Sequence, residues 1–182
     1  KETVQDRQGL AEAAGLRPAV LEIESNATAL AARRLISNMP SKGKDAFIAI
    51  FEIGGGASFL QIIHNNNVIY DRDQSFNGGQ LTRMITRQYG VSQEEAEQKK
   101  RNNDLPADYK TVVLRPFVES VGQEINRALQ FFFTSTPHNR IDHILLAGGS
   151  AVLDGLTDAV IDATGFATSV ANPFEEMVMD AA

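Results

Sequence analysis

The chain has 182 residues, 43% of them hydrophobic and 22% charged, and a formal net charge of -6 at pH 7. These values are typical of a globular protein with a sizeable core, and no stretch has the roughly 20 apolar residues of a membrane-spanning helix. The acidic balance argues against sequence-independent binding of nucleic acid, and the absence of cysteine excludes disulfides and thiolate metal sites.

The beginning of the chain predicts a helix, a short strand and a second helix. Residues 1–14 place apolar side chains on one helical face and are followed by Gly15, which predicts a helix with a clean stop. Residues 19–24 alternate as a short strand, and Ser25 is placed to cap a second helix over residues 26–37. We expect this fragment to be too small to close a core of its own.

A linker and a three-stranded antiparallel meander follow. Residues 38–44 combine Pro, Gly, Ser and Lys without periodicity, which predicts a linker and a domain boundary near residue 44. Residues 45–75 alternate apolar and polar side chains in three runs. Glycines at 54–56 and asparagines at 65–67 separate the runs, so two tight turns are expected to join the strands.

The first of these turns is a candidate binding site for an anion. Gly54, Gly55 and Gly56 carry no side chain, so their backbone N–H groups are able to approach a phosphate closely. Glu52 stands two residues earlier and is a candidate contact for the cation or the water of a metal-phosphate ligand. A plain hairpin turn beside a strand-end glutamate explains the same residues, so both interpretations stay open.

The next segment predicts two short helices. Residues 76–79 read FNGG and lead into a helix over residues 80–89, which Gly90 ends. Ser92 and Glu95 match a capping box, and the mostly polar residues that follow predict a second helix on the surface.

A long amphipathic helix is predicted over residues 109–133, where apolar side chains recur at spacings of three and four. Pro116 lies near its start, so either the first turn is kinked or the helix begins later. The three phenylalanines at 131–133 do not fit on one stripe. At least one ring is therefore expected to pack against a further element or to lie exposed as a contact surface.

The last part of the chain has the pattern of an α/β unit. Residues 141–146 predict a buried strand, residues 156–164 a helix after a glycine-containing loop, and residues 166–171 a further strand. Asn172 is placed to cap a final helix. The order from residue 46 predicts an α/β protein of the ribonuclease H-like class, with three antiparallel strands plus parallel additions and helices on both faces.

Five motifs spread over the chain carry a resemblance to a known family. They are EIGGGAS at residues 52–58, SFNGGQLT at 75–82, RALQFFFTST at 127–136, LLAGGSAVLDGL at 145–156 and VANPFEEM at 170–177. Together they are similar to the PilM family of type IV pilus assembly proteins, which belongs to the actin-like ATPase superfamily and is related to FtsA. The resemblance covers nearly the whole chain and implies the actin-like ATPase fold.

The resemblance implies two unequal parts. Residues 1–44 are similar to the end of a first actin-like domain with its linker, and residues 45–182 to the second domain, with a small helical insert at about residues 91–107. The chain begins with lysine and shows no secretory leader, so we expect a piece of a longer protein. No loop like the family's first phosphate loop precedes residue 46. This chain alone is therefore expected to bind ATP weakly or not at all and to be inactive.

The resemblance also implies roles for single residues on the phosphate side of a nucleotide. Gly54, Gly55 and Gly56 would face the phosphates of ATP, which with Mg²⁺ is the implied cofactor of the intact protein. Glu52 stands where the family usually has aspartate. It keeps the negative charge and is one methylene longer, so it is the candidate contact for the metal ion or the water.

On the nucleoside side, Gly148, Gly149 and Ser150 would line the adenosine. Glu97 and Lys100 match the pair that reaches the ribose and adenine in FtsA and DnaK-like relatives. A solvated ion pair on an exposed helix explains Glu97 and Lys100 equally well, so this alternative stays open.

The resemblance further implies a cytoplasmic scaffold in type IV pilus biogenesis. Its partners would be the N-terminal tail of a PilN-like inner-membrane protein and the pilus motor and platform proteins, which would hold it peripherally at the inner membrane. Self-association stays open. Two other functions stay open as well: an active ATPase or small-molecule kinase of the same fold, and a nucleotide-independent interaction module that uses the phenylalanines at 131–133.

Other chemistry finds little support in the sequence. His138, Asp142 and His143 do not make a full ligand set, so no zinc site and no directly bound metal is predicted. A two-metal nuclease would need more converging carboxylates than Glu52 and Asp142 provide. No G-x-S-x-G motif is present, which argues against a nucleophilic hydrolase.

Overall fold

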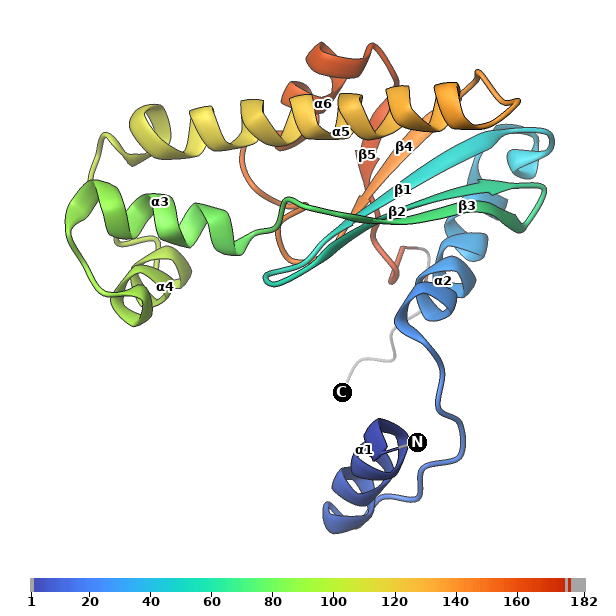
Figure 1. Ribbon diagram of the computed structural model, residues 1–182, viewed down its shortest axis with the longest axis horizontal. Coiled ribbons are helices and arrows are strands. Elements are labelled where there is room, and N and C mark those ends of the chain that lie inside the picture. The colour runs from blue at the N-terminus through green and yellow to red at the C-terminus, as the bar shows by residue number, and fades with distance from the viewer. Residues whose placement is uncertain (1, 176, 178–182) are drawn as a thin grey trace.

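The computed structural model describes residues 2–175 and 177. A five-stranded sheet lies at its centre, and α1 stands apart at one end (Figure 1). The helices are α1 (Glu2–Ala13), α2 (Glu24–Asn38), α3 (Gly79–Tyr89), α4 (Gln93–Arg101), α5 (Arg115–Ser135) and α6 (Leu156–Thr164). The strands are β1 (Phe47–Ile53), β2 (Ser58–His64), β3 (Asn67–Gln74), β4 (His143–Ala147) and β5 (Thr168–Val170).

The sheet has the order β3-β2-β1-β4-β5 and mixes both strand directions. β1, β2 and β3 form the predicted antiparallel meander, β4 runs parallel to β1, and β5 runs parallel to β4. Asn65 and Asn66 make the turn between β2 and β3 with φ angles of 49° and 64°, in the left-handed region that asparagine tolerates. The predicted mixed sheet is confirmed.

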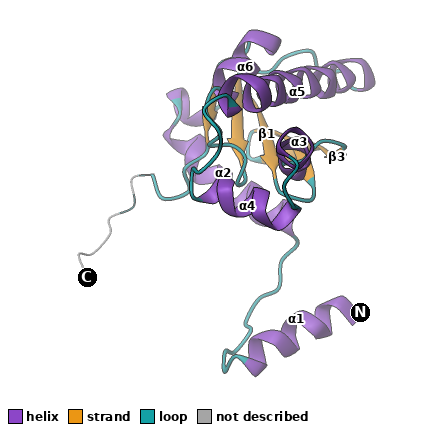
Figure 2. Cartoon of the chain, turned by 90° about the vertical axis from the view of Figure 1, so that its left-hand side faces the viewer, coloured by secondary structure: helices purple, strands orange, loops and turns teal. Residues whose placement is uncertain are grey.

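Alternation along the strands divides the side chains of the sheet between two cores. On β1, Phe51 and Ile53 are fully buried in the larger core with α3, α5 and α6. Ile48 and Ile50 point the other way and pack with α2 in a smaller core. Figure 2 shows α5 and α6 on one side of the sheet and α2 on the other, so the prediction of helices on both faces is confirmed.

α2 contributes one side of the smaller core. Its Ala29, Ala32 and Ile36 side chains are buried against the sheet. The chain after α2 turns back at Gly43, which has a φ of 65° and where any side chain would overlap Ile36. α2 therefore packs on the same sheet as the rest of the chain, while a domain boundary near residue 44 stays a prediction.

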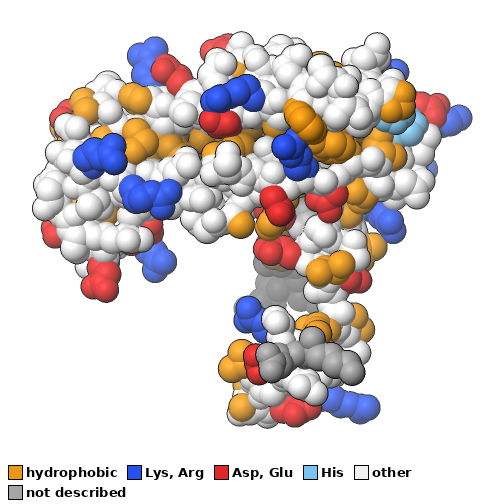
Figure 3. Space-filling view, viewed as in Figure 1, with side chains coloured by type: hydrophobic (Ala, Val, Ile, Leu, Met, Phe, Trp, Pro, Cys, Tyr) orange, Lys and Arg blue, Asp and Glu red, His pale blue; other side chains and the backbone are white. Residues whose placement is uncertain are grey.

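The first part of the chain departs from its predicted packing. α1 forms and is followed by Gly15 as predicted, but residues 19–24 do not form a strand. No strand of the described chain runs beside them, so their backbone has no ladder to join. Leu10 and Val20 are 63% and 83% exposed, and Figure 3 shows hydrophobic side chains on the surface of α1.

The start of α2 also differs from the prediction. Ser25 is not the cap, because the helix already begins at Glu24 and Ile23 occupies the capping position. No side chain among the described residues caps this helix; the Glu22 carboxylate accepts hydrogen bonds from the Ile23 N–H at 2.9 Å and from Asn26 Nδ2 at 3.1 Å.

Other helix boundaries follow the sequence closely. Gly90 and Gly165 end α3 and α6 with φ angles of 68° and 74°. The Ser92 hydroxyl caps α4 by accepting a hydrogen bond from the Glu95 N–H at 3.1 Å. The Glu95 carboxylate lies 3.8 Å from the Lys99 ammonium, so it completes an ion pair along α4.

The long helix forms, but its first turn is wider than expected. Lys110–Leu114 make a π-helical turn that continues directly into α5. Pro116 lies in the first turn of α5, where its missing N–H interrupts the regular hydrogen-bond ladder. The helix therefore changes from π-helical to α-helical geometry next to the proline and continues without a break.

The three phenylalanines at the end of α5 have different surroundings, as predicted. Phe132 is fully buried, and Phe133 packs against Phe166 with ring centroids 6.2 Å apart. Phe131 is 47% exposed, and the Arg72 guanidinium lies 3.8 Å from its ring centroid.

The C-terminal elements are shorter than predicted. β4 begins at His143 instead of residue 141, and β5 covers only Thr168–Val170. Asn172 Oδ1 accepts a hydrogen bond from the Phe174 N–H at 3.1 Å, but residues 173–175 form a turn and residue 177 is not helical, so the predicted final helix does not form there. Residues 176 and 178–182 of that prediction lie outside the described residues. Among the residues described, no helix combines the length and apolar character needed to cross a bilayer.

Gly122 sets the distance between α5 and α6. A Cβ at this position would lie 2.6 Å from the Ala159 carbonyl oxygen, so Gly122→Ala must move the helices apart. We expect the free energy of unfolding, measured by urea denaturation, to fall by about 1–3 kcal/mol. The control is Gly9→Ala on α1, where nothing lies within 4 Å of the added atom. Equal free energies of unfolding in Gly122→Ala and Gly9→Ala would contradict this account of the packing.

Candidate functional site

Three glycine-containing loops meet beside the ends of β1 and β4 and the start of α3. Segment 77–79, which leads into α3 and ends at its first residue, donates three hydrogen bonds to turn 54–56, after β1. They run from Gly78 N–H to Gly54 O (2.8 Å), from Gly79 N–H to Gly55 O (2.9 Å) and from Asn77 Nδ2 to Gly56 O (3.1 Å). The carbonyl oxygens of the turn are therefore all held by the protein.

The N–H groups of the same turn are used differently. Gly54 donates its N–H to the Ala57 carbonyl at 3.0 Å. Within residues 2–175 and 177, neither Gly55 nor Gly56 donates its N–H to a protein acceptor. Neighbouring backbone donors with no side chain around them favour an anion, so the turn is chemically suited to hold a phosphate oxygen.

The loop after β4 presses against the end of β1. Gly148 has a φ of 85°, and a Cβ there would lie 2.6 Å from the Ile53 carbonyl oxygen. Ser150 donates its N–H to the same oxygen at 3.2 Å, and a side chain at Gly78 would overlap the Ser150 hydroxyl. Gly148 is therefore required for packing of the loops themselves, whereas a side chain at Gly78 would require the Ser150 hydroxyl to move.

These loops and α4 border a cleft of about 410 Å³, which we call the glycine cleft. Five residues predicted as site residues line it: Gly55, Glu97, Lys100, Gly149 and Ser150. The predicted residues Gly54, Gly56 and Gly148 lie in the same loops but do not line the cleft. Nothing lies within 4 Å of a Cβ added at Gly55 or Gly149, so there is open space beside both residues.

Besides the apolar Leu81 and Leu153, four residues that line the glycine cleft were missed by sequence reasoning: Gly78, Gly79, Gln93 and Arg101. A signal was present for three of them. Gly78 and Gly79 form a glycine pair directly before a helix, and Arg101 continues the basic last turn of α4. Gln93 at the start of α4 has no distinguishing pattern, because its position at the cleft depends on how α4 packs.

Glu97 and Lys100 are anchored to α3 through Thr82. The Lys100 ammonium lies 2.7 Å from Glu97 Oε1 and 2.9 Å from Thr82 Oγ1, and the Thr82 hydroxyl donates to Glu97 Oε1. Thr82 is fully buried. The bonds from Lys100 and then from Thr82 hold the pKa of the Glu97 carboxyl below its ordinary value. The pair is thus fixed between two helices, while its contact with a nucleotide stays a prediction.

Glu52 lies away from the glycine cleft. Its carboxylate accepts a hydrogen bond from the Thr28 hydroxyl of α2 at 2.5 Å. β1 directs alternate side chains to opposite faces, and Glu52 shares the α2 face with Ile50. The structure therefore does not bring Glu52 together with the other predicted site residues, and its metal or water contact stays a prediction.

The histidines have partners within the fold. His64 stacks on Phe47 with ring centroids 4.1 Å apart, and His143 Nε2 lies 2.8 Å from the Ser169 hydroxyl. Burial lowers the pKa of His143. Over residues 2–175 and 177, no three side chains of the metal-binding types gather at one place.

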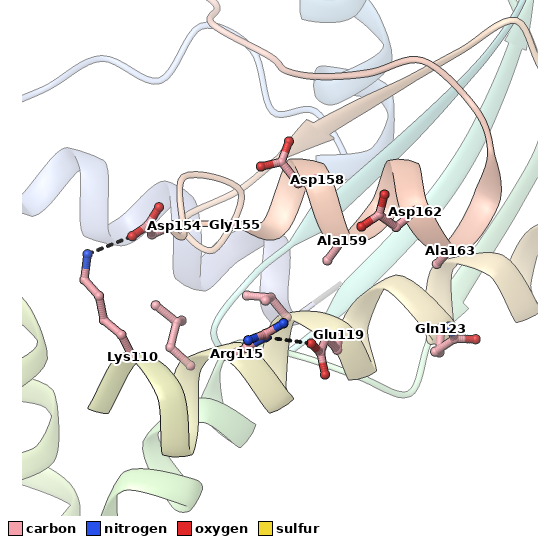
Figure 4. Close-up of a pocket in the computed structure, with 12 residues that line it drawn as sticks. Lys110, Arg115, Glu119, Gln123, Asp154, Gly155, Asp158, Ala159, Asp162 and Ala163 are labelled. Carbon is pink, nitrogen blue, oxygen red and sulfur yellow. Dashed lines mark hydrogen bonds and ion pairs between the residues drawn. The ribbon is translucent and has the colours of Figure 1, made fainter. Parts of the chain in front are cut away.

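A second hollow, of about 430 Å³, lies between α5 and α6 and contains none of the predicted site residues. Figure 4 shows two ion pairs at its rim: Lys110 lies 2.8 Å from Asp154 across the rim, and Arg115 lies 3.1 Å from Glu119 along α5. Lys110 and Asp154 are each 70% exposed, so this pair contributes little stability. Because both cations at the rim are already paired, this hollow is a weaker candidate for an anion site than the glycine cleft.

Comparison with known proteins identifies relatives of this architecture. The family model for the type IV pilus assembly protein PilM matches residues 1–182. Among solved structures, a chain of the PilM-PilN type IV pilus biogenesis complex is similar, with a TM-score of 0.71 and 25% sequence identity. The match covers 89% of this chain and 45% of that chain, so the present sequence spans about half the length of that relative.

Two more distant structures share the fold. The ethanolamine utilization protein EutJ from Carboxydothermus hydrogenoformans has a TM-score of 0.58 and 21% identity, covering 78% of this chain and 47% of that chain. MreB 5 of Spiroplasma citri bound to AMPPNP has a TM-score of 0.55 and 18% identity, covering 84% of this chain and 61% of that chain. The predicted fold and family are thereby confirmed: the chain has the actin-like ATPase fold and belongs to the PilM family of type IV pilus assembly proteins.

Proposed function

We propose that this chain provides one half of an ATP–Mg²⁺ site in a scaffold protein of type IV pilus biogenesis. The observation that carries the proposal is the convergence of four separate segments on the glycine cleft: the turn after β1, the segment before α3, the helix α4 and the loop after β4. Glycine turns at one end and charged side chains at the other suit a nucleotide, which joins anionic phosphates to a polar nucleoside.

The phosphates would meet the glycine end of the cleft. The N–H groups of Gly55 and Gly56, which bond no acceptor among the described residues, supply donors, and Gly149 leaves room for a ligand close to the backbone. Because Glu52 is bonded to Thr28 on the α2 face, Mg²⁺ would be held mainly by the phosphates, water and residues of the longer protein. MreB 5, which has the same fold, binds the nucleotide analogue AMPPNP, and this supports a nucleotide as the ligand class.

The site would be completed by the other half of a longer protein. The present chain spans 45% of its relative in the PilM-PilN complex, and tight phosphate binding depends on donors that converge from both sides. On its own the chain would bind ATP weakly or not at all. In the complete protein, ATP would mainly stabilise the closed arrangement of the two halves, with little or no hydrolysis.

The scaffold role concerns partners at the membrane. Membership of the PilM family and similarity to the PilM-PilN complex support binding of the cytoplasmic tail of a PilN-like inner-membrane protein. Such a tail would bind as an extended peptide that becomes ordered on docking. The complete protein would then lie on the cytoplasmic side of the inner membrane and link this partner to the pilus motor and platform proteins.

An exposed apolar strip indicates where the rest of the longer protein would pack. Leu16, Val20, Ile23 and Leu30 are 66%, 83%, 66% and 52% exposed, although all four are large hydrophobic side chains. Repeated exposure of large apolar side chains along one part of the chain marks a contact surface. We infer that the remainder of the first actin-like domain covers this strip.

Titration of Mg-ATP into the protein of full family length tests the glycine cleft. Gly149→Asp adds a negative charge where there is space for the side chain, so the loop keeps its shape. Repulsion of the phosphates should weaken ATP binding by at least about tenfold, measured calorimetrically. The control is Gly9→Asp, which adds the same charge to exposed α1 and should bind like the wild type.

Two further measurements separate the alternatives. Gly148→Ala should lower thermal stability as well as ATP binding, because its Cβ meets the Ile53 carbonyl oxygen. Phosphate release by the wild type should stay near background for a scaffold, whereas rapid release would favour an active ATPase. Equal ATP affinity in Gly149→Asp and Gly9→Asp would remove the glycine cleft as the site.

The strip is tested by comparing one variant in two chains. Leu16→Ser with Val20→Ser should leave the stability of the present chain unchanged, because both side chains are mostly exposed here. In the full-length protein the same variant should lower the free energy of unfolding by about 1.5–3 kcal/mol for each side chain that becomes buried. Equal effects in both chains, measured by urea denaturation, would show that the strip stays uncovered.

A further inference from the structure

The inference concerns Thr82, which lies at the centre of a hydrogen-bonded group between α3 and α4. Its side chain is fully buried, and its hydroxyl contacts two charged residues of the cleft, Glu97 and Lys100. The oxygen accepts a hydrogen bond from the Lys100 ammonium at 2.9 Å while the hydroxyl donates to Glu97 Oε1. The Thr82 hydroxyl thus uses both its donor and one of its acceptor sites in bonds to side chains of α4.

This group leaves one acceptor and one donor for further bonds. Glu97 Oε1 is occupied by Thr82 and Lys100, whereas Oε2 has no partner among the described residues. Lys100 has three N–H donors, of which two are used, one by Thr82 and one by Glu97. Glu97 and Lys100 both line the glycine cleft, so the remaining oxygen and N–H are available to a ligand there.

A fixed acceptor beside a fixed donor suits a sugar with neighbouring hydroxyl groups. Each hydroxyl both donates and accepts a hydrogen bond, so a ribose is able to satisfy the carboxylate and the ammonium together. A sugar without its 2′-hydroxyl leaves one of these polar groups without a partner, and sites built around a hydroxyl reject analogues that lack it.

Thr82 matters because Glu97 and Lys100 have long side chains with many rotamers. Their side chains are 37% and 26% exposed, so without an inner anchor they are free to turn toward bulk water. The anchor is independent of the ligand, since its bonds already exist in the protein alone.

We propose that Thr82 is the positioning residue that holds Glu97 and Lys100 in place for a ribose, so that the cleft selects ribonucleotides over 2′-deoxyribonucleotides. This inference rests on the proposed ATP site. Thr82 itself touches no ligand; it acts through the two residues that do.

The test measures the affinities of Mg-ATP and Mg-2′-deoxyATP for the full-length protein. The wild type should prefer ATP by at least about tenfold. Thr82→Val keeps the shape and loses the hydroxyl, so it should lower ATP affinity to within about twofold of the deoxyATP value and leave deoxyATP binding nearly unchanged. Thr82→Ser retains the hydroxyl and should keep the preference.

A matched control lies on the same helix. The hydroxyl of Thr86 is buried without a hydrogen-bond partner among the described residues, so Thr86→Val makes the same chemical change without touching the group. This variant should show the wild-type preference for ATP. Thermal unfolding of all variants reports whether they fold.

The outcomes separate the inference from the function on which it rests. If the wild type binds neither nucleotide, the proposed ATP site is wrong and the inference falls with it. If the wild type prefers ATP over deoxyATP and Thr82→Val shows the same preference, only the inference is wrong. If Thr82→Val lowers the affinities for ATP and deoxyATP equally, Thr82 has only a structural role and the inference is overturned as well.

Should Thr82→Val fail to fold, Thr82→Ala replaces it. Alanine also removes the buried hydroxyl and leaves Glu97 and Lys100 in place. A lost preference in Thr82→Ala together with a retained preference in Thr82→Ser supports the inference, and a retained preference in both contradicts it.

Discussion

The architecture depends on how closely three loop backbones approach one another. Gly148 lies against the end of β1 so tightly that a Cβ would come within 2.6 Å of the Ile53 carbonyl oxygen, and a Cβ at Gly79 would lie 2.8 Å from the Gly55 carbonyl oxygen. Close-packed backbone leaves no room for even one methyl group. Because these contacts join the ends of β1 and β4 to the start of α3, they position the whole glycine cleft.

α3 connects these loops to α4 on the other side of the cleft. Its Leu81 and Ile85 side chains are buried in the larger core, and its Thr82 hydroxyl reaches α4. α4 is mostly polar and buries only Ala96 among its described residues, so apolar packing contributes little to its placement. The polar group around Thr82 therefore has an unusual share in holding α4, and the two ends of the cleft are connected through one helix.

The two faces of the sheet serve different contacts. One face carries the large core beneath α3, α5 and α6, and the other carries α2, the hydrogen bond between Glu52 and Thr28 and the nearby exposed strip. A chain that spans 45% of its relative is expected to present such incomplete surfaces. The apolar strip and the half-built phosphate site both lack contacts that the longer protein would supply.

Local patterns predicted the features whose partners lie close in the chain. The meander, the glycines that end α3 and α6 and the Ser92 cap depend on neighbouring residues. The motifs identified the family, and the family resemblance identified five residues of the cleft. Residues 19–24 were predicted wrongly, because alternation specifies a strand only where another strand supplies hydrogen bonds. The sequence by itself thus determined most of the elements and the family. Only the tertiary structure decided that Glu52 bonds α2 and that Thr82 bonds α4, because these contacts join residues 24, 15 and 18 positions apart.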